Sequence, residues 1–329
     1  MESINILVSF TADDQQRQLV NRTLSGVGEV SFLEDLRDRK SAIENADVIL
    51  AWNPPREFSD DEYPLMKRAK LMQLLSAGAD HLKFNVFPEN FEIAGNVGAY
   101  ATPMSEHAMA MVLALAKDLR GGHIKLKAGN FDQFSLNRSI YGATCAILGF
   151  GGIGKATAQR MRAFGAKIFA VNTSGRTDEE VDFIGTIKDL KYVLENADII
   201  IISMPLSNST RKLIGEQEFS WMKPDAILVN VARGEIIDEK VFYEFLKSHP
   251  NFKAGIDAWW VEPFRHGRFE MNYPFLDLPN VIGTPHNSGM VPEAIDTAIE
   301  DAIDNIKRYI QGGNVKGIFN KKEYLENDL

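Results

Sequence analysis

Three polar residues in the last third of the chain have the chemistry to move a proton beside a bound anion. They are Arg233, Glu262 and His286. Histidine exchanges a proton near neutral pH, and a neighbouring carboxylate stabilises its charged form and fixes its tautomer. The rigid fork of arginine suits a carboxylate together with an adjacent carbonyl oxygen. Taken singly, each also has an ordinary interpretation: a loop histidine, a surface-turn arginine and a solvated glutamate.

The positions of these residues along the chain favour a common site. Each follows a short apolar run that predicts a buried strand, over residues 227–231, 254–257 and 281–284. Ligands of open α/β sheets bind at the carboxyl ends of the strands. We therefore interpret the three side chains as parts of one catalytic site.

A glycine-rich turn in the middle of the chain predicts a dinucleotide site. Gly149-Phe150-Gly151-Gly152-Ile153-Gly154 follows an apolar run over 143–148 and precedes a predicted helix over 155–164. In the order strand, turn and helix, the first glycine makes the turn, the second lets backbone approach a pyrophosphate, and the third packs helix on strand. Free N–H groups at the helix N-terminus attract phosphate. A dinucleotide beside a proton donor and an anion clamp predicts hydride transfer to an α-keto acid.

Alternating strands and helices over the whole chain predict an α/β protein with parallel sheets. We expect two Rossmann-like, doubly wound domains, with a dinucleotide-binding domain (101–287) inserted into a substrate-binding domain (1–100 and 288–329). A last helix over 292–310 would return to the first domain. Besides the strands named above, we expect strands over 4–10, 48–52, 71–75, 91–94, 167–171 and 199–204.

A helix that begins near Pro103 has an unusual apolar distribution. Thr102 is its predicted N-cap, and Gly121-Gly122 are predicted to end it after Arg120. Between Ala108 and Ala116 it is apolar on all sides, so one stripe facing one core does not explain it. Two domains or a second subunit would cover it on both sides, and we favour the subunit.

Composition excludes several classes of function. The chain has 329 residues and a net charge of −9, which argues against nucleic-acid and anionic-membrane binding. A single cysteine, Cys145, excludes a disulfide within the chain and a multi-cysteine zinc site, and we expect no bound metal. With no signal peptide and no apolar stretch long enough to span a bilayer, we expect a cytoplasmic protein.

The loop after the predicted strand 167–171 bears on cofactor choice. A fold that prefers NAD places an acidic residue there to hold the ribose 2′-hydroxyl. Here the loop reads Asn172-Thr173-Ser174-Gly175-Arg176, and the first carboxylate is Asp178. Asn172, Thr173, Ser174 and Arg176 would accept a 2′-phosphate, so we predict NADP(H) over NAD(H). The alternative is a solvated Arg176, with Asn172 bound to a ribose.

Over nearly its whole length the chain resembles the D-isomer-specific 2-hydroxyacid dehydrogenase family. Several motifs in order carry the resemblance: residues 75–80, 105–107, the glycine turn, 204–206 with Thr210, 230–238, Asp257, 262–263 and 284–286.

This resemblance implies an NAD(P)-dependent D-2-hydroxyacid dehydrogenase and a role for each matching position. His286 would be the acid/base, Glu262 its partner, and Arg233 the clamp on the substrate. Ser76, Ala77 and Gly78 would bind the substrate carboxylate, mainly through backbone N–H groups. Asp257 would contact the nicotinamide carboxamide. The other implied cofactor contacts are Met204, Pro205, Thr210, Val231, Ala232, Arg233 and His286.

The resemblance leaves several functional alternatives. Glyoxylate or hydroxypyruvate reduction is favoured, because that branch of the family often uses NADPH. D-lactate-type and phosphoglycerate dehydrogenases are alternatives, the former because Tyr100 lies near the predicted hinge. Formate dehydrogenases have glutamine in place of Glu262, so this residue favours hydroxyacid chemistry. An alternative of another class is a non-catalytic, dinucleotide-sensing corepressor.

Three further interpretations concern residues outside these motif roles. The apolar helix matches the dimer-forming segment of the family, which implies a homodimer. His107 lies in that helix, where a packed, hydrogen-bonded role is favoured over catalysis. Trp259-Trp260 would either wall the active site or pack in the core.

Overall fold

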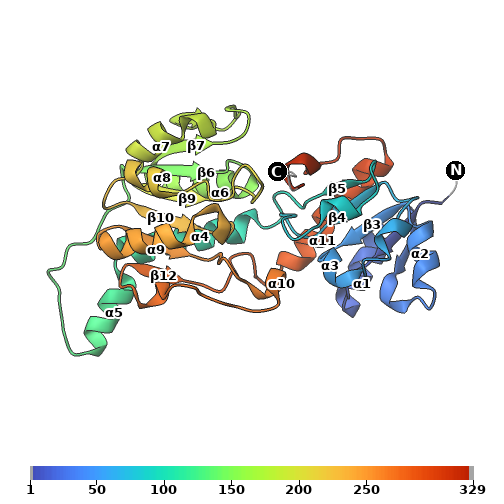
Figure 1. Cartoon of the computed structure of the whole chain (residues 1–329), viewed down its shortest axis with the longest axis horizontal. Coiled ribbons are helices and arrows are strands. Elements are labelled where there is room, and N and C mark those ends of the chain that lie inside the picture. Colours follow the sequence, from blue (N-terminus) through green and yellow to red (C-terminus); the bar gives the residue numbers. More distant parts are fainter. Residues whose placement is uncertain (1–2, 326–329) are drawn as a thin grey trace. The chain divides into compact units, whose positions relative to one another are not determined.

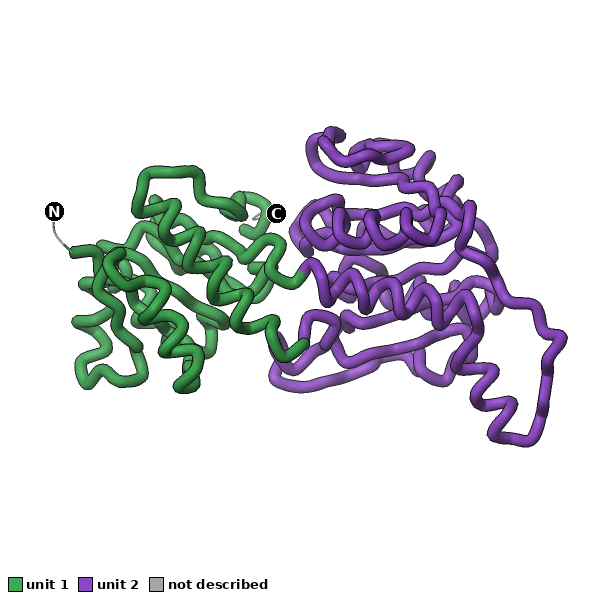
Figure 2. Tube along the Cα trace, turned by 180° about the vertical axis from the view of Figure 1, so that it is seen from behind, with its two compact units in different colours: residues 1–100, 291–329 green, residues 101–290 purple. Residues whose placement is uncertain are grey.

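The computed structural model describes residues 3–325, which form two compact units. Unit 1 comprises Met1–Tyr100 and Val291–Leu329, and unit 2 comprises Ala101–Met290 (Figure 2). The chain thus leaves unit 1 after Tyr100 and returns to it after Met290, where the sequence placed the crossings after residues 100 and 287.

Unit 1 contains a parallel sheet that is five-stranded in the described residues, with strand order β2-β1-β3-β4-β5. This is the flavodoxin-like doubly wound order. The central strands β3 and β4 are buried along their whole length, as parallel strands covered by helices on both faces should be. The strands are β1 (Asn5–Val8), β2 (Glu29–Phe32), β3 (Val48–Ala51), β4 (Leu71–Leu74) and β5 (Glu92–Ala94).

Helices from both ends of the chain cover this sheet. Asp13 caps α1 through a capping box with Gln16, and the last helix, α11, packs beside α1. The buried face of α11 carries Ile299, Ile303 and Ile306 against the residues of β1, β3 and β4. The helices are α1 (Asp14–Thr23), α2 (Arg39–Asn45), α3 (Pro54–Glu57) and α11 (Ala294–Ile310), with 3-10 turns at Leu33–Asp35, Tyr63–Leu65, Phe84–Val86 and Lys321–Glu323.

Unit 2 contains a second parallel sheet, seven-stranded within the described residues, in the order β12-β11-β10-β9-β6-β7-β8. Strands β6 to β11 follow the Rossmann order, and β12 extends the sheet beyond β11. The predicted fold class is confirmed. The strands are β6 (Thr144–Leu148), β7 (Lys167–Val171), β8 (Phe183–Gly185), β9 (Ile199–Ile202), β10 (Ile227–Asn230), β11 (Lys253–Ile256) and β12 (Val281–Gly283).

The helices of unit 2 lie on both faces of its sheet (Figure 1). Two hydrophobic clusters, one on each face, fill the space between helices and strands. The helices are α4 (Ala101–Ala116), α5 (Leu119–Lys127), α6 (Gly152–Ala163), α7 (Leu190–Asn196), α8 (Glu216–Trp221), α9 (Glu239–Ser248) and α10 (Pro263–His266), with 3-10 turns at Ile187–Asp189, Gly234–Ile236 and Phe275–Asp277.

The prediction of one helix from Pro103 to Arg120 is wrong at both ends. Helix α4 already begins at Ala101, so Thr102 lies inside it, and it ends at Ala116. The break comes at Asp118, whose backbone is left-handed with φ of 47°. Helix α5 starts directly afterwards and contains Gly121-Gly122, so these glycines do not end a helix here.

Most of the apolar surface of α4 is covered from within its own unit. The helix packs against α6 and against strands β10 and β11, and its buried residues belong to the core on that face. Ala110 is exposed and Leu113 and Ala114 are half-buried, so one face of the helix is not covered within the unit, and its contact with a second subunit stays a prediction. No helix among the described residues is both long and apolar enough to cross a membrane.

Candidate active site

His286 and Glu262 form a close pair in unit 2. The Nδ1 atom of His286 lies 2.7 Å and 2.8 Å from the two carboxylate oxygens of Glu262. The Glu262 side chain is 7% exposed and that of His286 is 28% exposed. Because a carboxylate accepts the Nδ1 proton, Nε2 is the ring nitrogen left to face a ligand.

Local structure places Glu262 at the start of α10. Pro263 occupies the first turn of this helix, and the backbone N–H of Trp259 donates to Glu262 Oε1 over 2.6 Å. The Glu262 N–H itself donates to Nδ1 of His266, 3.0 Å away. The loop thus fixes both the carboxylate of Glu262, through Trp259, and its backbone, through His266.

Arg233 follows β10, on a loop that Asn230 fixes. The Asn230 side chain accepts from the N–H of Ala232 over 3.0 Å and donates to the carbonyl of Arg233 over 2.8 Å. A Cβ on Gly234 would lie 2.5 Å from the carbonyl carbon of Trp259, so only glycine lets the two loops pack this closely. Since β10, β11 and β12 are adjacent and parallel, Arg233, Glu262 and His286 follow the same edge of one sheet.

An ion pair joins the Arg233 loop to α10. Arg265 Nη1 lies 2.6 Å from Glu235 Oε1, and these side chains are only 13% and 14% exposed. Glu235 comes two residues after Arg233, and Arg265 comes three after Glu262. The sequence analysis missed this pair, because no local pattern connects two residues that different strands bring together.

The glycine turn has the geometry of a phosphate cradle. Gly149 has φ of 105°, and a Cβ there would lie 2.3 Å from the backbone nitrogen of Met204. A Cβ on Gly154 would lie 2.3 Å from the carbonyl oxygen of Gly149. A Cβ on Gly151, in contrast, would meet no atom of the described residues within 4 Å. The first and third glycines therefore serve packing, while the second leaves open space at the N-terminus of α6, which fits a dinucleotide pyrophosphate.

The side chain of Asn172 stabilises the loop after β7 through hydrogen bonds to the loop backbone. Asn172 Oδ1 accepts from the N–H groups of Ser174 and Gly175 over 3.1 Å and 2.7 Å, and its amide donates to the carbonyl of Arg176. Thr173, Ser174 and Arg176 are exposed. The nearby acidic side chains Glu179 and Glu180 pair with Lys155 and Arg162 of α6.

The remaining predicted cofactor residues lie at strand ends and are mostly buried. The Thr210 hydroxyl donates to the carbonyl of Pro205 and accepts from the N–H of Ser207, both over 2.8 Å. Asp257 is fully buried and bonds to the loop that follows β12. Their cofactor contacts stay predictions. The other buried side chains in this set are Phe150, Met204, Val231 and Ala232.

The predicted substrate residues Ser76, Ala77 and Gly78 follow β4 in unit 1, whereas Arg233 and His286 belong to unit 2. The Ser76 hydroxyl donates to the carbonyl of Gly78 over 3.0 Å. Tyr100 donates its hydroxyl to the carbonyl of Leu75 over 3.1 Å, and burial raises the pKa of Tyr100 to about 12. Binding of a substrate carboxylate by this loop stays a prediction.

Trp259 and Trp260 pack in the core of unit 2. They are 5% and 9% exposed, and Trp260 stacks on Phe275 with ring centroids 5.2 Å apart. Both indole N–H groups are bonded, that of Trp259 to the carbonyl of Thr284 and that of Trp260 to the carbonyl of Ile237. Core packing is therefore the interpretation that the structure supports.

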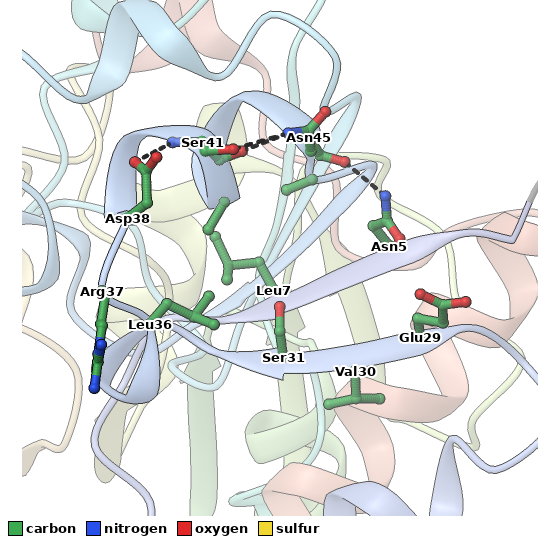
Figure 3. Close-up of a pocket in the computed structure, with 12 residues that line it drawn as sticks. Asn5, Leu7, Glu29, Val30, Ser31, Leu36, Arg37, Asp38, Ser41 and Asn45 are labelled. Atoms are coloured by element: carbon green, nitrogen blue, oxygen red, sulfur yellow. Dashed lines mark hydrogen bonds between the residues drawn. The ribbon is translucent and has the colours of Figure 1, made fainter.

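A cavity of about 400 Å³ lies within unit 1, between α2 and strands β1 and β2 (Figure 3), and none of its lining residues was predicted as a site residue. The polar groups on its rim bond to one another: Ser41 N–H to Asp38, the Asn45 amide to the Ser41 carbonyl, and the Asn5 amide to the Asn45 carbonyl. These bonds serve to cap and anchor α2. In residues 3–325 no group of three or more His, Cys, Asp or Glu side chains could hold a metal ion.

Comparisons with known proteins agree with this geometry. Residues 109–288 match the family described as "D-isomer specific 2-hydroxyacid dehydrogenase, NAD binding domain". The chain is 33% identical over 231 residues to a hydroxypyruvate reductase of Thermotoga maritima, covering 69% of this chain and 73% of the relative. It is 28% identical over 320 residues to a D-3-phosphoglycerate dehydrogenase of Methanocaldococcus jannaschii, covering 95% of this chain but only 60% of that relative.

A solved structure extends the likeness to both units. The glycerate dehydrogenase related protein of Thermoplasma acidophilum is 30% identical, with a TM-score of 0.64, and the match covers 93% of this chain and 99% of that one. The family match, over residues 109–288, covers the glycine turn, the Arg233 loop and the His286–Glu262 pair. The chain belongs to the D-isomer-specific 2-hydroxyacid dehydrogenase family.

Proposed function

We propose that this protein reduces a small 2-oxo acid to the D-2-hydroxy acid with a nicotinamide cofactor, and that glyoxylate or hydroxypyruvate is the substrate. The observation that carries the proposal is the His286–Glu262 pair, which lies at the same sheet edge as the Arg233 loop and the glycine turn. The hydroxypyruvate reductase relative supports the choice of substrate.

His286, Glu262 and Arg233 of unit 2 each have a separate role in the proposed reaction. A reduced nicotinamide cofactor, held by its pyrophosphate at the glycine turn, would supply the hydride. His286, charged and held at Nδ1 by Glu262, gives its Nε2 proton to the carbonyl oxygen of the substrate as that oxygen gains charge. The Glu262 carboxylate stabilises the imidazolium before the transfer and fixes the ring orientation throughout. Arg233 binds the substrate carboxylate and stabilises the developing alkoxide.

The test is turnover on a panel of 2-oxo acids, followed by the absorbance of NADPH. We expect His286→Gln to lower kcat by about 10²- to 10⁴-fold, which is the usual contribution of a general acid. His123→Gln, which alters an exposed histidine on α5, is the matched control and should keep normal turnover. Near-normal turnover by the His286 variant would show that another group donates the proton. Cofactor binding without turnover on any member of the panel would instead favour a sensor.

We propose NADP(H) as the preferred cofactor. The loop after β7 presents hydroxyls and the exposed Arg176, and among the described residues its acidic neighbours Glu179 and Glu180 face Lys155 and Arg162. The Arg176 guanidinium would attract a 2′-phosphate, which a carboxylate at the end of β7 would repel. Arg176→Ala should lower kcat/KM for NADPH about tenfold and leave that for NADH unchanged, while Arg308→Ala on α11 is a neutral control. A wild-type preference for NADH above about tenfold would contradict the proposal.

We also propose a homodimer in which α5 and residues 128–141 contact a second copy. This segment extends away from the rest of unit 2 (Figure 1). Contiguous exposed apolar groups of this kind mark interaction surfaces. Ile140 is buried, but seven other large apolar side chains of the segment are 54–99% exposed: Leu119, Ile124, Leu126, Phe131, Phe134, Leu136 and Tyr141.

Sedimentation velocity tests the dimer. The wild-type chain should sediment as a dimer, and Phe134→Ser with Leu136→Ser should shift it toward monomer. Ile187→Ser, an exposed apolar position outside the segment, is the matched control and should leave the dimer intact. A monomeric wild-type protein at the concentrations used for activity would overturn this proposal.

A further inference from the structure

The backbone of His286 has a conformation that needs support. Its φ is 50°, in the left-handed region that residues with a side chain rarely adopt. Such a conformation persists when surrounding contacts determine it, and it is typical of functional sites. Specific contacts must therefore stabilise the left-handed backbone of His286.

The buried carboxylate of Asp257 accepts hydrogen bonds from residues on both sides of His286. Asp257 Oδ1 accepts from the hydroxyl of Thr284 over 2.6 Å and from the N–H of Asn287 over 3.2 Å. Asp257 Oδ2 accepts from the N–H of Ser288 over 3.3 Å. Asp257 is 0% exposed, so its charge depends on these donors. The loop from Thr284 to Ser288 is thus tied to β11 at three points.

His107 of α4 completes the arrangement. Its Nε2 lies 3.0 Å from the Thr284 hydroxyl oxygen and 3.7 Å from Asp257 Oδ1. A threonine hydroxyl has one proton, and here it is donated to Asp257. Thr284 can therefore only accept from His107, which fixes the His107 proton on Nε2. The result is a directed chain of hydrogen bonds from His107 through Thr284 to Asp257.

We propose that His107 is a positioning residue for His286. By donating to Thr284, it orients the threonine hydroxyl toward Asp257, and that carboxylate holds the left-handed turn in which His286 Nδ1 reaches Glu262. Helix α4 suits this role because it packs firmly on α6 and on strands β10 and β11. The catalytic consequence rests on the proposed function, whereas the effect on the loop does not.

Two pairs of variants test the hydrogen-bond chain from both ends. His107→Gln keeps a donor near the Nε2 position, and His107→Met has similar length but no donor. Thr284→Ser keeps the hydroxyl, and Thr284→Val removes it with little change of shape. Ser105→Ala is the matched control, because this buried hydroxyl on the same helix donates to the carbonyl of Thr102, one turn away and outside the chain of hydrogen bonds.

The first readout is hydrogen–deuterium exchange of the peptide 284–290, which does not depend on turnover. We expect His107→Met and Thr284→Val to speed exchange about fivefold, as the loss of one hydrogen bond implies. The same two variants should lower kcat about tenfold with KM for the 2-oxo acid changed less than about twofold. His107→Gln, Thr284→Ser and Ser105→Ala should behave as wild type. Because both losses break the same bond, the double variant should be no worse than the worse single one.

Several results would overturn the proposal. One is equal exchange in His107→Gln and His107→Met, and another is fully additive losses in the double variant. Wild-type turnover with no change of exchange in Thr284→Val would do the same. If the wild-type protein reduces none of the 2-oxo acids but the exchange pattern appears as expected, the proposed function fails and the positioning role of His107 stands.

Discussion

Replacing Gly151 by alanine should separate cofactor binding from folding. Its φ is −94°, which any residue adopts, and a Cβ there would meet no described atom within 4 Å. Loss of unfolded-chain entropy favours alanine by about 0.4–1 kcal/mol. Alanine is a poorer N-cap than glycine and costs up to about 1 kcal/mol relative to it at the start of α6. These terms oppose each other, so the free energy of unfolding should change by less than about 1 kcal/mol.

The same methyl group should obstruct a dinucleotide. It would occupy the open space at the N-terminus of α6, where the backbone must approach a pyrophosphate. We expect the Kd for NADPH, measured by calorimetric titration, to rise at least about tenfold, or about 1.4 kcal/mol. A Gly151→Ala protein that binds NADPH as tightly as wild type would refute the phosphate cradle.

Gly149→Ala is the matched comparison two residues earlier. Its φ of 105° and the 2.3 Å approach of its Cβ to the Met204 nitrogen both oppose a side chain. The neighbouring atom is backbone and cannot swing away, so we expect a loss of about 2–4 kcal/mol in the free energy of unfolding. A Gly149→Ala protein with an unchanged urea midpoint would show that the turn is not built as described.

Two further predictions concern buried carboxyl groups. Glu262→Gln keeps an acceptor for His286 Nδ1 but removes the charge, so kcat should fall about a hundredfold while the urea midpoint changes little; unchanged turnover would mean that the charge does not matter. Burial raises the pKa of Glu57, so the stability linked to its protonated form is present at low pH and is lost as pH rises through that raised pKa. Glu57→Gln does not titrate, so its stability relative to wild type should increase in urea unfolding as pH rises above the ordinary pKa of a glutamate, about 4.3, and a constant difference would contradict the shift.

The sequence predicted most strands well, including the edge strands β5 and β12, but it missed the two other edge strands. Strand β7 matches its prediction over Lys167–Val171, because a continuous apolar run is a strong signal of a strand covered on both faces. Strands β2 and β8 were not predicted. Both are short edge strands with half-exposed residues, and β2 begins with the exposed Glu29, so neither forms an apolar run.

Local sequence patterns also did not predict the break between α4 and α5 or the contacts around the site. Apolar periodicity does not show that Asp118 adopts a left-handed backbone. The strand-end positions of Arg233, Glu262 and His286 followed from the alternation of strands and helices. The bond from His107 to Thr284, 177 residues later in the chain, depends on how α4 packs beside β11, which no short stretch of sequence encodes.

The acid/base pair, the arginine loop and the glycine turn all lie within residues 101–290, whereas the Ser76–Gly78 loop lies in the other unit. Under the proposed function, substrate choice and proton transfer therefore depend on residues of different units. Substitutions around β4 can change which acid is accepted without altering the distance between His286 and Glu262. A lineage can therefore explore new substrates while it inherits its proton chemistry unchanged, as the different substrates named for its relatives suggest.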